Sequence, residues 1–246
     1  MAAADKQGAF IFWNHPGWKP EHKGWFDIHT TLYERKYLCG IEVVNGDSYD
    51  PESHEWALSK NLTFLGNSDI HQPAGLEEGP QVRSFALGSP DMPAGGHRPM
   101  TFVFVKERSI PAIKEALIAG RTAIWFENKV IGRKEYAESL FKAAVRVTDA
   151  EREGKKVVRF TVRNDSDLPV ELQRAGKLGP KEVNLPPNTS ARVKIDTSSD
   201  QEQIDLIYMA DNFLVAPKKG MPVKLLIAPD LTMDIKVDVP LTSIVP

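Results

Sequence analysis

Apolar strands and helical segments alternate over the first seventy residues, and this alternation restricts the fold more than any other feature of the chain. Three nearly continuous apolar runs predict strands, and two segments with helical periodicity separate them. The predicted strands cover 9–13, 40–45 and 62–67, and the predicted helices cover 28–38 and 51–60. Strands that are apolar on both faces and are joined by helices are typical of a parallel sheet covered on both sides. The first part of the chain is therefore predicted to be α/β.

The segment 72–100 interrupts this pattern. It is rich in Pro and Gly, has no periodicity, and is too long for a simple connection. It is either a lid over the strand ends or a disordered excursion. The pattern resumes with strands at 101–105 and 122–126 on either side of a helix at 109–119, for which Ser109 is a plausible N-cap. We expect these elements to continue the α/β unit.

Beyond residue 142 only two-residue alternation remains, with turn signals at regular intervals. Five segments carry it, at 157–163, 191–195, 204–208, 223–227 and 233–237. The sequence thus predicts two domains, an α/β domain over 1–142 and a small antiparallel β-sandwich over 143–246.

Composition excludes several classes of protein. The 246 residues are 41% hydrophobic, and this content can fill a core. The net charge of −2, with interspersed signs, argues against nucleic acid as an obligate partner. The longest apolar runs are far shorter than the roughly 18 residues of a membrane span, so we expect no membrane partner. A cytoplasmic location is the default, and export of a longer form stays open.

Polar residues follow each predicted strand of the α/β domain. Because the carboxyl ends of parallel strands meet at one edge of a sheet, these residues are expected to converge on one site. They are Asn14 and His15 after the first strand, Asn45 after the second, and Asn67, Asp69 and His71 after the third.

Asp69 and His71 form half of a metal site. In an extended backbone alternate side chains share a face, so both can point at one ion while Ile70 turns into the packing. A carboxylate beside an imidazole suits Zn, Mn or Fe better than a redox copper or an iron–sulfur cluster. The single Cys39 excludes an internal disulfide and a cysteine cage for zinc, so the other ligands would be His or carboxylates.

Further candidates each have a plainer interpretation. By itself His15, which precedes Pro16, would be an ordinary turn residue, but together with Asp69 and His71 it is a candidate ligand. Glu42 is an acid inside an apolar strand, and it either reaches the site or pairs with a basic neighbour. We favour a supporting role for it over direct ligation.

Asn45 and Asn67 either orient ligands or take part in turns. Arg98 is suited to bind phosphate oxygens, or is an exposed loop residue. His22, His29 and His54 fall in a polar loop or on helices and are expected at the surface.

Three motifs resemble the C-terminal half of a PHP (polymerase and histidinol phosphatase) domain: Asn-His-Pro-Gly-Trp at 14–18, Gly-Ile-Glu-Val-Val-Asn-Gly at 40–46, and Gly-Asn-Ser-Asp-Ile-His at 66–71. The segments 98–104 and 113–122 are similar to the tail of bacterial PHP-type phosphodiesterases that carry a small β-domain. The resemblance implies a distorted (β/α)7 barrel that holds two or three divalent ions, usually Zn, Mn or Fe. It also implies that His15, Asp69 and His71 are metal ligands, with Asp69 also handling a proton. Glu42 and Asn45 match the strand motif.

The chain departs from the family pattern in one respect. A PHP domain opens with a His-x-His strand, and this sequence contains no His-x-His. It also has too few βα units to close a barrel of about 200 residues or more. We therefore expect a partial (β/α)7 PHP-type barrel, truncated at the N-terminus, followed by a β-sandwich.

The expected function is a divalent-metal-dependent phosphoester hydrolase, most specifically a phosphodiesterase for a small-molecule phosphoester, that lacks part of its site. One alternative is a non-catalytic β-sandwich binding module carried on a PHP remnant. Another is a barrel completed by exchange between two copies of the chain.

Overall fold

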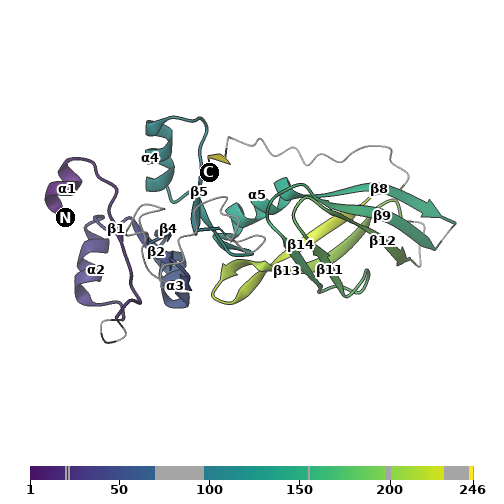
Figure 1. Cartoon of the computed structure of the whole chain (residues 1–246), viewed down its shortest axis with the longest axis horizontal. Coiled ribbons are helices and arrows are strands. Elements are labelled where there is room, and N and C mark those ends of the chain that lie inside the picture. The colour runs from purple at the N-terminus through teal and green to yellow at the C-terminus, as the bar shows by residue number, and fades with distance from the viewer. Residues whose placement is uncertain are drawn as a thin grey trace, which may run out of the picture. The chain divides into compact units, whose positions relative to one another are not determined.

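The protein is described by a computed structural model at residues 1–19, 21, 23–69, 97–154, 156–197, 201–229 and 244–245. The chain divides into two compact units (Figure 1). Unit 1 contains Met1–Arg133, Ala216–Lys218 and Leu241–Pro246, and unit 2 contains Lys134–Val215 and Lys219–Pro240. The predicted strand at 233–237 and nearly all of the Pro/Gly-rich segment lie outside the described residues.

The first sheet of unit 1 is built around a buried central strand, β2 (Gly40–Asn45). It runs parallel to β1 (Phe12–Trp13) and β4 (Thr63–Asn67), which confirms the parallel arrangement expected from the apolar runs. The short β3 (Ser48–Tyr49) returns antiparallel along the end of β2. Parallel strands of this kind place their C-terminal ends at one edge.

Three helices accompany this sheet: α1 (Ala2–Lys6), α2 (Asp27–Glu34) and α3 (Pro51–Ser59). The N-terminus of α3 is fixed by Asp50, whose carboxylate accepts hydrogen bonds from the Glu52 backbone N–H (3.0 Å) and the Ser53 hydroxyl (2.7 Å). Pro51 occupies the first turn, where its missing N–H leaves no bond unmade.

The second sheet of unit 1 corrects one expectation. Its strands are β5 (Met100–Phe104), β6 (Thr122–Phe126), β7 (Lys129–Gly132) and β15 (Ile244–Val245), in the order β15-β5-β6-β7. Every pairing between them is antiparallel, so this part does not continue the parallel sheet. A two-residue turn closes the β6–β7 hairpin, in which Glu127 takes a positive φ of 52°. The helix α4 (Ile110–Ile118) begins at the expected cap, since Ser109 Oγ accepts the Ala112 N–H at 3.2 Å.

The end of β4 lies unusually close to the second sheet. Gly66 N–H donates to Thr101 Oγ1 (2.9 Å), and that hydroxyl donates to Gly66 O (3.1 Å). A Cβ at Gly66 would lie 2.5 Å from Ile124 Cγ2, so only glycine fits there. This contact fixes the position from which Asn67 and the residues after it leave the strand.

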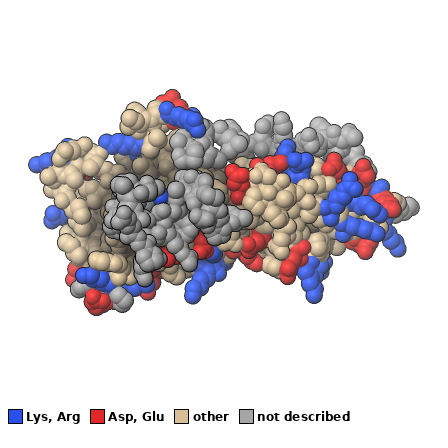
Figure 2. All heavy atoms as spheres, viewed as in Figure 1, with Lys and Arg blue, Asp and Glu red and all other residues tan. Residues whose placement is uncertain are grey.

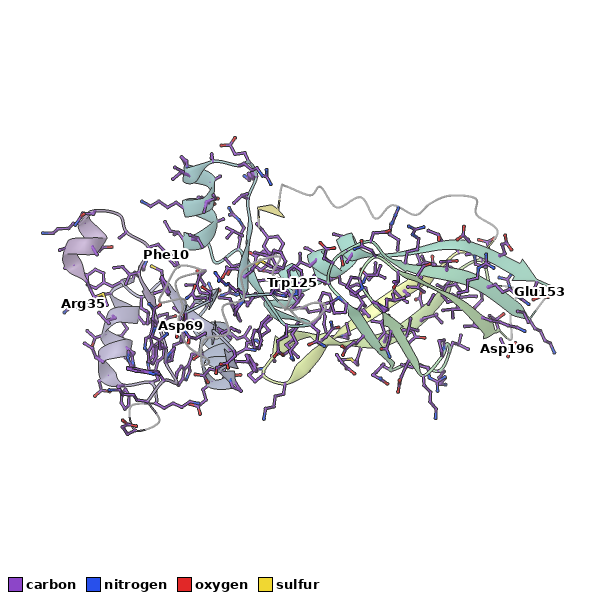
Figure 3. All side chains as sticks on the ribbon, in the orientation of Figure 1. Phe10, Arg35, Asp69, Trp125, Glu153 and Asp196 are labelled. Atoms are coloured by element: carbon purple, nitrogen blue, oxygen red, sulfur yellow. The ribbon has the colours of Figure 1, made fainter. Side chains whose placement is uncertain are left out.

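Unit 2 contains α5 (Lys134–Ala144) and two antiparallel sheets. Its strands are β8 (Val145–Glu153), β9 (Val157–Asn164), β10 (Val170–Arg174), β11 (Glu182–Leu185), β12 (Ser190–Asp196), β13 (Ile204–Ala216) and β14 (Lys219–Ile227). One sheet has the order β12-β9-β8, and Glu153 and Asp196 lie at the same end of it, on either side of Val157 (Figure 3). The other sheet joins β11, β10, β13 and β14.

Burial alternates along the strands of unit 2, as the sequence predicted. Phe160, Leu172 and Leu206 point inward, whereas Arg159 and Arg163 are exposed. Acidic and basic side chains are interspersed on the face shown in Figure 2, in agreement with the small net charge. In the described residues, no helix is long and apolar enough to cross a membrane.

Candidate metal site

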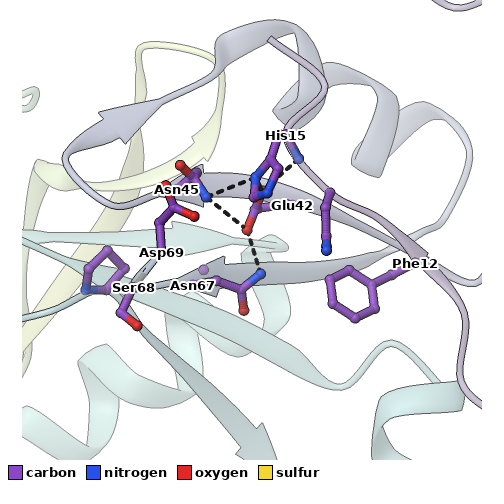
Figure 4. Close-up of a pocket in the computed structure, with 10 residues that line it drawn as sticks. Phe12, His15, Glu42, Asn45, Asn67, Ser68 and Asp69 are labelled. Carbon is purple, nitrogen blue, oxygen red and sulfur yellow. Dashed lines mark hydrogen bonds and ion pairs between the residues drawn. The ribbon is translucent and has the colours of Figure 1, made fainter. Parts of the chain in front are cut away.

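A pocket of about 550 Å³ lies at the C-terminal ends of β1, β2 and β4 (Figure 4). Its walls come from the three strand ends that the sequence expected to converge, together with one residue that precedes β5. The residues that line it are Phe12, Asn14, His15, Glu42, Asn45, Gly66, Asn67, Ser68, Asp69 and Pro99.

Glu42 is the buried centre of this pocket, with only 2% of its surface exposed. Its Oε2 accepts a hydrogen bond from the backbone N–H of His15 and also contacts the ring nitrogen Nδ1, each at 2.6 Å. Its Oε1 accepts from Asn67 Nδ2 at 2.6 Å and from Asn45 Nδ2 at 3.3 Å. A carboxylate offers about four acceptor positions, so these contacts satisfy a group that would otherwise be costly to bury. Glu42 thus organises the residues around it.

His15 and Asp69 share an uncommon backbone conformation. Their φ angles are +50° and +53°, in the left-handed region that few residues other than glycine adopt. At His15 the chain turns sharply, and the Trp18 N–H donates to the His15 carbonyl at 3.1 Å. Such conformations persist where the surroundings hold them, and they cluster at functional sites.

The side chain of His15 leaves one ring nitrogen available. Nδ1 contacts Glu42, and within the described part of the chain no hydrogen bond engages Nε2. The imidazole is 40% exposed. An imidazole nitrogen and a carboxylate lining one pocket are donors that suit Zn, Mn or Fe.

The structure brings together five of the seven residues predicted for the site. His15, Glu42, Asn45, Asn67 and Asp69 all line the pocket. His71 lies outside the described residues, as does His22. Arg98 is half-buried and is not among the described lining residues, although its neighbour Pro99 is.

Among the residues that the structure describes, no group of three or more His, Cys, Asp or Glu side chains could hold a metal. His15 and Asp69 alone do not make a ligand set, so a metal here would need further ligands from outside the described residues.

Sequence reasoning missed two apolar walls of the pocket. Phe12 belongs to an apolar strand and was assigned to the core by the pattern, yet it is only half-buried and faces the pocket. Pro99 gave no signal, because a proline that follows a Pro/Gly-rich segment is an ordinary loop residue.

The expectation that His54 lies at the surface was wrong. It is fully buried on the inner face of α3 together with Ser53 and Ala57. Its Nδ1 lies 2.8 Å from the Tyr49 hydroxyl, and its ring packs edge-on against Phe64. Burial lowers the pKa of His54 to about 4, and burial likewise raises the pKa of Tyr49 to about 12.

His29 is half-buried, which also corrects its expected surface position. Its ring stacks on Trp13, with centroids 3.8 Å apart. Burial lowers its pKa. Both His29 and His54 are therefore parts of the packing and not of the pocket.

Two comparisons with known proteins found a match. A family model described as an Ig-like domain matches residues 144–226. The chain is also similar to the crystal structure of a two-domain protein from Bacteroides vulgatus containing a predicted PHP-like metal-dependent phosphoesterase. The two are 37% identical with a TM-score of 0.80, over 92% of this chain. This chain spans 64% of the length of that one. No curated protein matches the chain.

Proposed function

We propose that this chain belongs to a divalent-metal-dependent phosphoester hydrolase of the PHP type. The observation that carries the proposal is the shared pocket of His15 and Asp69 at the ends of parallel strands. The likeness to a protein containing a predicted PHP-like metal-dependent phosphoesterase supports the same chemistry. In this proposal β1, β2 and β4 are consecutive strands of a partial (β/α)7 barrel.

His15 Nε2, the Asp69 carboxylate and His71 would hold the metal. Zn, Mn or Fe fits this donor set. When bound, a divalent ion supplies the Lewis acidity that activates water and neutralises phosphoryl oxygens. A complete family member would hold two or three ions, so further ligands would come from outside the described residues.

In this proposal Asp69 has a second role besides ligation, because its carboxylate would accept a proton from the attacking water. Glu42, Asn45 and Asn67 hold His15 in place through the hydrogen bonds around the buried carboxylate. Arg98 would bind a phosphoryl oxygen with its guanidinium group.

We propose a small-molecule phosphodiester as the substrate. The pocket is lined mainly by polar groups, with Phe12 and Pro99 as apolar walls against which an organic substituent can pack.

The proposal is tested by hydrolysis of a generic aryl phosphodiester with added Mn²⁺ or Zn²⁺. The assay compares this chain with its Asp69→Ala and His71→Ala variants. We expect metal-dependent turnover from this chain and loss of that turnover in both variants. Wild-type turnover in metal-free protein carrying both substitutions would refute the proposal.

A second candidate is a binding role for unit 2, favoured by its match to an Ig-like domain. In this case the α/β unit only supports the module. Exposed aromatic side chains would be expected on a glycan-binding face, but the exposed large apolar residues described in unit 2 are Leu178 and Ile207. The test is binding of the whole chain to a panel of glycans. Binding that is the same in wild type and in Asp69→Ala would favour this candidate.

A further inference from the structure

The contacts of His15 Nδ1 raise a question about the position of the ring proton. A neutral imidazole carries one N–H donor and one bare nitrogen acceptor. Nδ1 lies 2.6 Å from Glu42 Oε2, an acceptor, and 2.9 Å from Asn45 Nδ2, a donor. Nδ1 can donate to the first or accept from the second, but no single ring tautomer satisfies both neighbours.

The shorter contact decides the arrangement. If Nδ1 lacked a proton, its lone pair would face the carboxylate oxygen at 2.6 Å, and the two would repel. If Nδ1 carries the proton, it donates a short, charge-assisted hydrogen bond to Glu42. The Asn45 amide is then left to donate to Glu42 Oε1, which lies 3.3 Å away.

Glu42 cannot easily turn away from this contact. It is buried, and the amide of Asn67 donates to its Oε1 at 2.6 Å while the backbone N–H of His15 donates to its Oε2. The same oxygen therefore binds the backbone and the ring of one residue, and it restrains both the left-handed turn at His15 and the orientation of the imidazole.

We propose that Glu42 is a positioning residue that fixes the Nδ1–H tautomer of His15, so that the lone pair of Nε2 is presented to a cation in the pocket. Asn45 and Asn67 hold the Glu42 carboxylate in the required orientation. This inference deepens the proposed function and rests on it for the identity of the cation. A partner that fixes one nitrogen of a ligating histidine orients the ring and raises its basicity.

The tautomer is measured on metal-free protein by two-bond ¹H–¹⁵N correlation of the histidine rings at about pH 8, where an ordinary imidazole is neutral. His15→Gln assigns the signals. We expect a protonated Nδ1 and a bare Nε2 for His15. The reverse pattern, with Nδ1 accepting from Asn45, would overturn the inference. This measurement needs no variant at Glu42, so it remains decisive even if such variants do not fold.

Glu42→Gln is the matched change, because it keeps the shape and replaces one acceptor oxygen with a donor. We expect it to shift His15 towards the Nε2–H tautomer and to weaken Zn²⁺ binding by about 10- to 100-fold. Glu55→Gln, at an exposed position of α3, should change neither quantity. An unchanged tautomer and affinity in Glu42→Gln would overturn the inference.

The two proposals fail in different ways. If wild-type protein shows the Nδ1–H tautomer but does not bind Zn²⁺, the metal-dependent function fails while the positioning of the ring stands. If Zn²⁺ binds at His15 with equal affinity in wild type and Glu42→Gln, the function stands and the positioning role fails.

Discussion

At the scale of single residues, the pocket holds two side chains on backbone that favours glycine. His15 and Asp69 both have positive φ, and left-handed backbone disfavours a side chain by about 1–2 kcal/mol. The chain thus retains an imidazole and a carboxylate at positions where their conformation opposes stability. Under the proposed function, this is the compromise expected of a site in which function sets the residue type.

Asp69→Gly should therefore weaken Zn²⁺ binding without lowering the stability of the fold. We expect the free energy of unfolding to stay the same or rise by up to about 1 kcal/mol, while Zn²⁺ affinity falls at least tenfold. Asp149→Gly is the matched control, since this exposed residue of unit 2 also has a positive φ (52°). It should leave Zn²⁺ affinity unchanged. Chemical denaturation and titration calorimetry measure the two quantities, and equal Zn²⁺ affinities in Asp69→Gly and wild type would contradict the expectation.

The buried His54 predicts a pH dependence of stability. Its pKa is about 4 in the folded protein and about 6.5 in the unfolded chain. As pH falls below about 6.5 the unfolded chain takes up the proton first, so stability is lost between about pH 6.5 and pH 4. The loss from this group is about 3 kcal/mol.

His54→Gln keeps a partner for Tyr49 but does not titrate, so its unfolding free energy should fall less over this range than that of wild type. Tyr49→Phe, which retains the titrating imidazole, should keep the steeper fall. Urea denaturation at several pH values gives the comparison. Parallel pH profiles for wild type and His54→Gln would show that His54 is not the responsible group.

At the scale of elements, the close approach of β4 to β6 holds the end of β4 at the pocket. Gly66→Ala places a methyl group 2.5 Å from Ile124 Cγ2, and overpacking of this kind destabilises a protein by about 1–3 kcal/mol. Ile124→Ala removes the atom in the way. We expect the double variant to be more stable than the sum of the two single changes indicates. Thermal unfolding of wild type, the two single variants and the double variant tests this. Strictly additive changes in stability would mean that contact with Ile124 is not what excludes a side chain at residue 66.

Strand content could be predicted from local sequence, but strand direction was predicted correctly only for β1, β2 and β4. The predicted bounds of β2 and β6 agree with the structure, because both are apolar runs between turn signals. β5 and β6 have the same apolar character as the parallel strands, yet they pair antiparallel. Direction depends on which neighbours each strand meets, and that is set by tertiary packing.

Only those parts of the candidate site that are marked by neighbouring residues in the sequence could be predicted. Polar residues after an apolar strand mark the strand end, and this pattern found His15, Asn45 and Asp69. The burial of His54 could not be found in this way, because one short helix with few apolar residues does not show which face is covered. Phe12 was missed because an apolar residue in a strand gives the same signal whether it packs inward or faces a pocket.

At the scale of the whole molecule, metal binding should affect one unit only. The pocket is formed entirely by unit 1, and the Ig-like match lies entirely in unit 2. We expect added Zn²⁺ to slow amide hydrogen exchange in peptides around β1, β2 and the end of β4, and to leave exchange in β8, β9 and β12 unchanged. Asp69→Asn should abolish the protection. Equal protection in both units would contradict the assignment of the site to unit 1.

Metal binding at His15 and Asp69 is the property on which the proposed function depends most directly. Isothermal titration of chelator-treated protein with Zn²⁺ measures it, with Asp47→Asn as a control for an exposed acid near the same strand ends. We predict saturable binding by wild type and Asp47→Asn, weakened at least tenfold in His15→Ala and in Asp69→Asn. Absence of binding in wild type, or unchanged affinity in both His15→Ala and Asp69→Asn, would contradict the account.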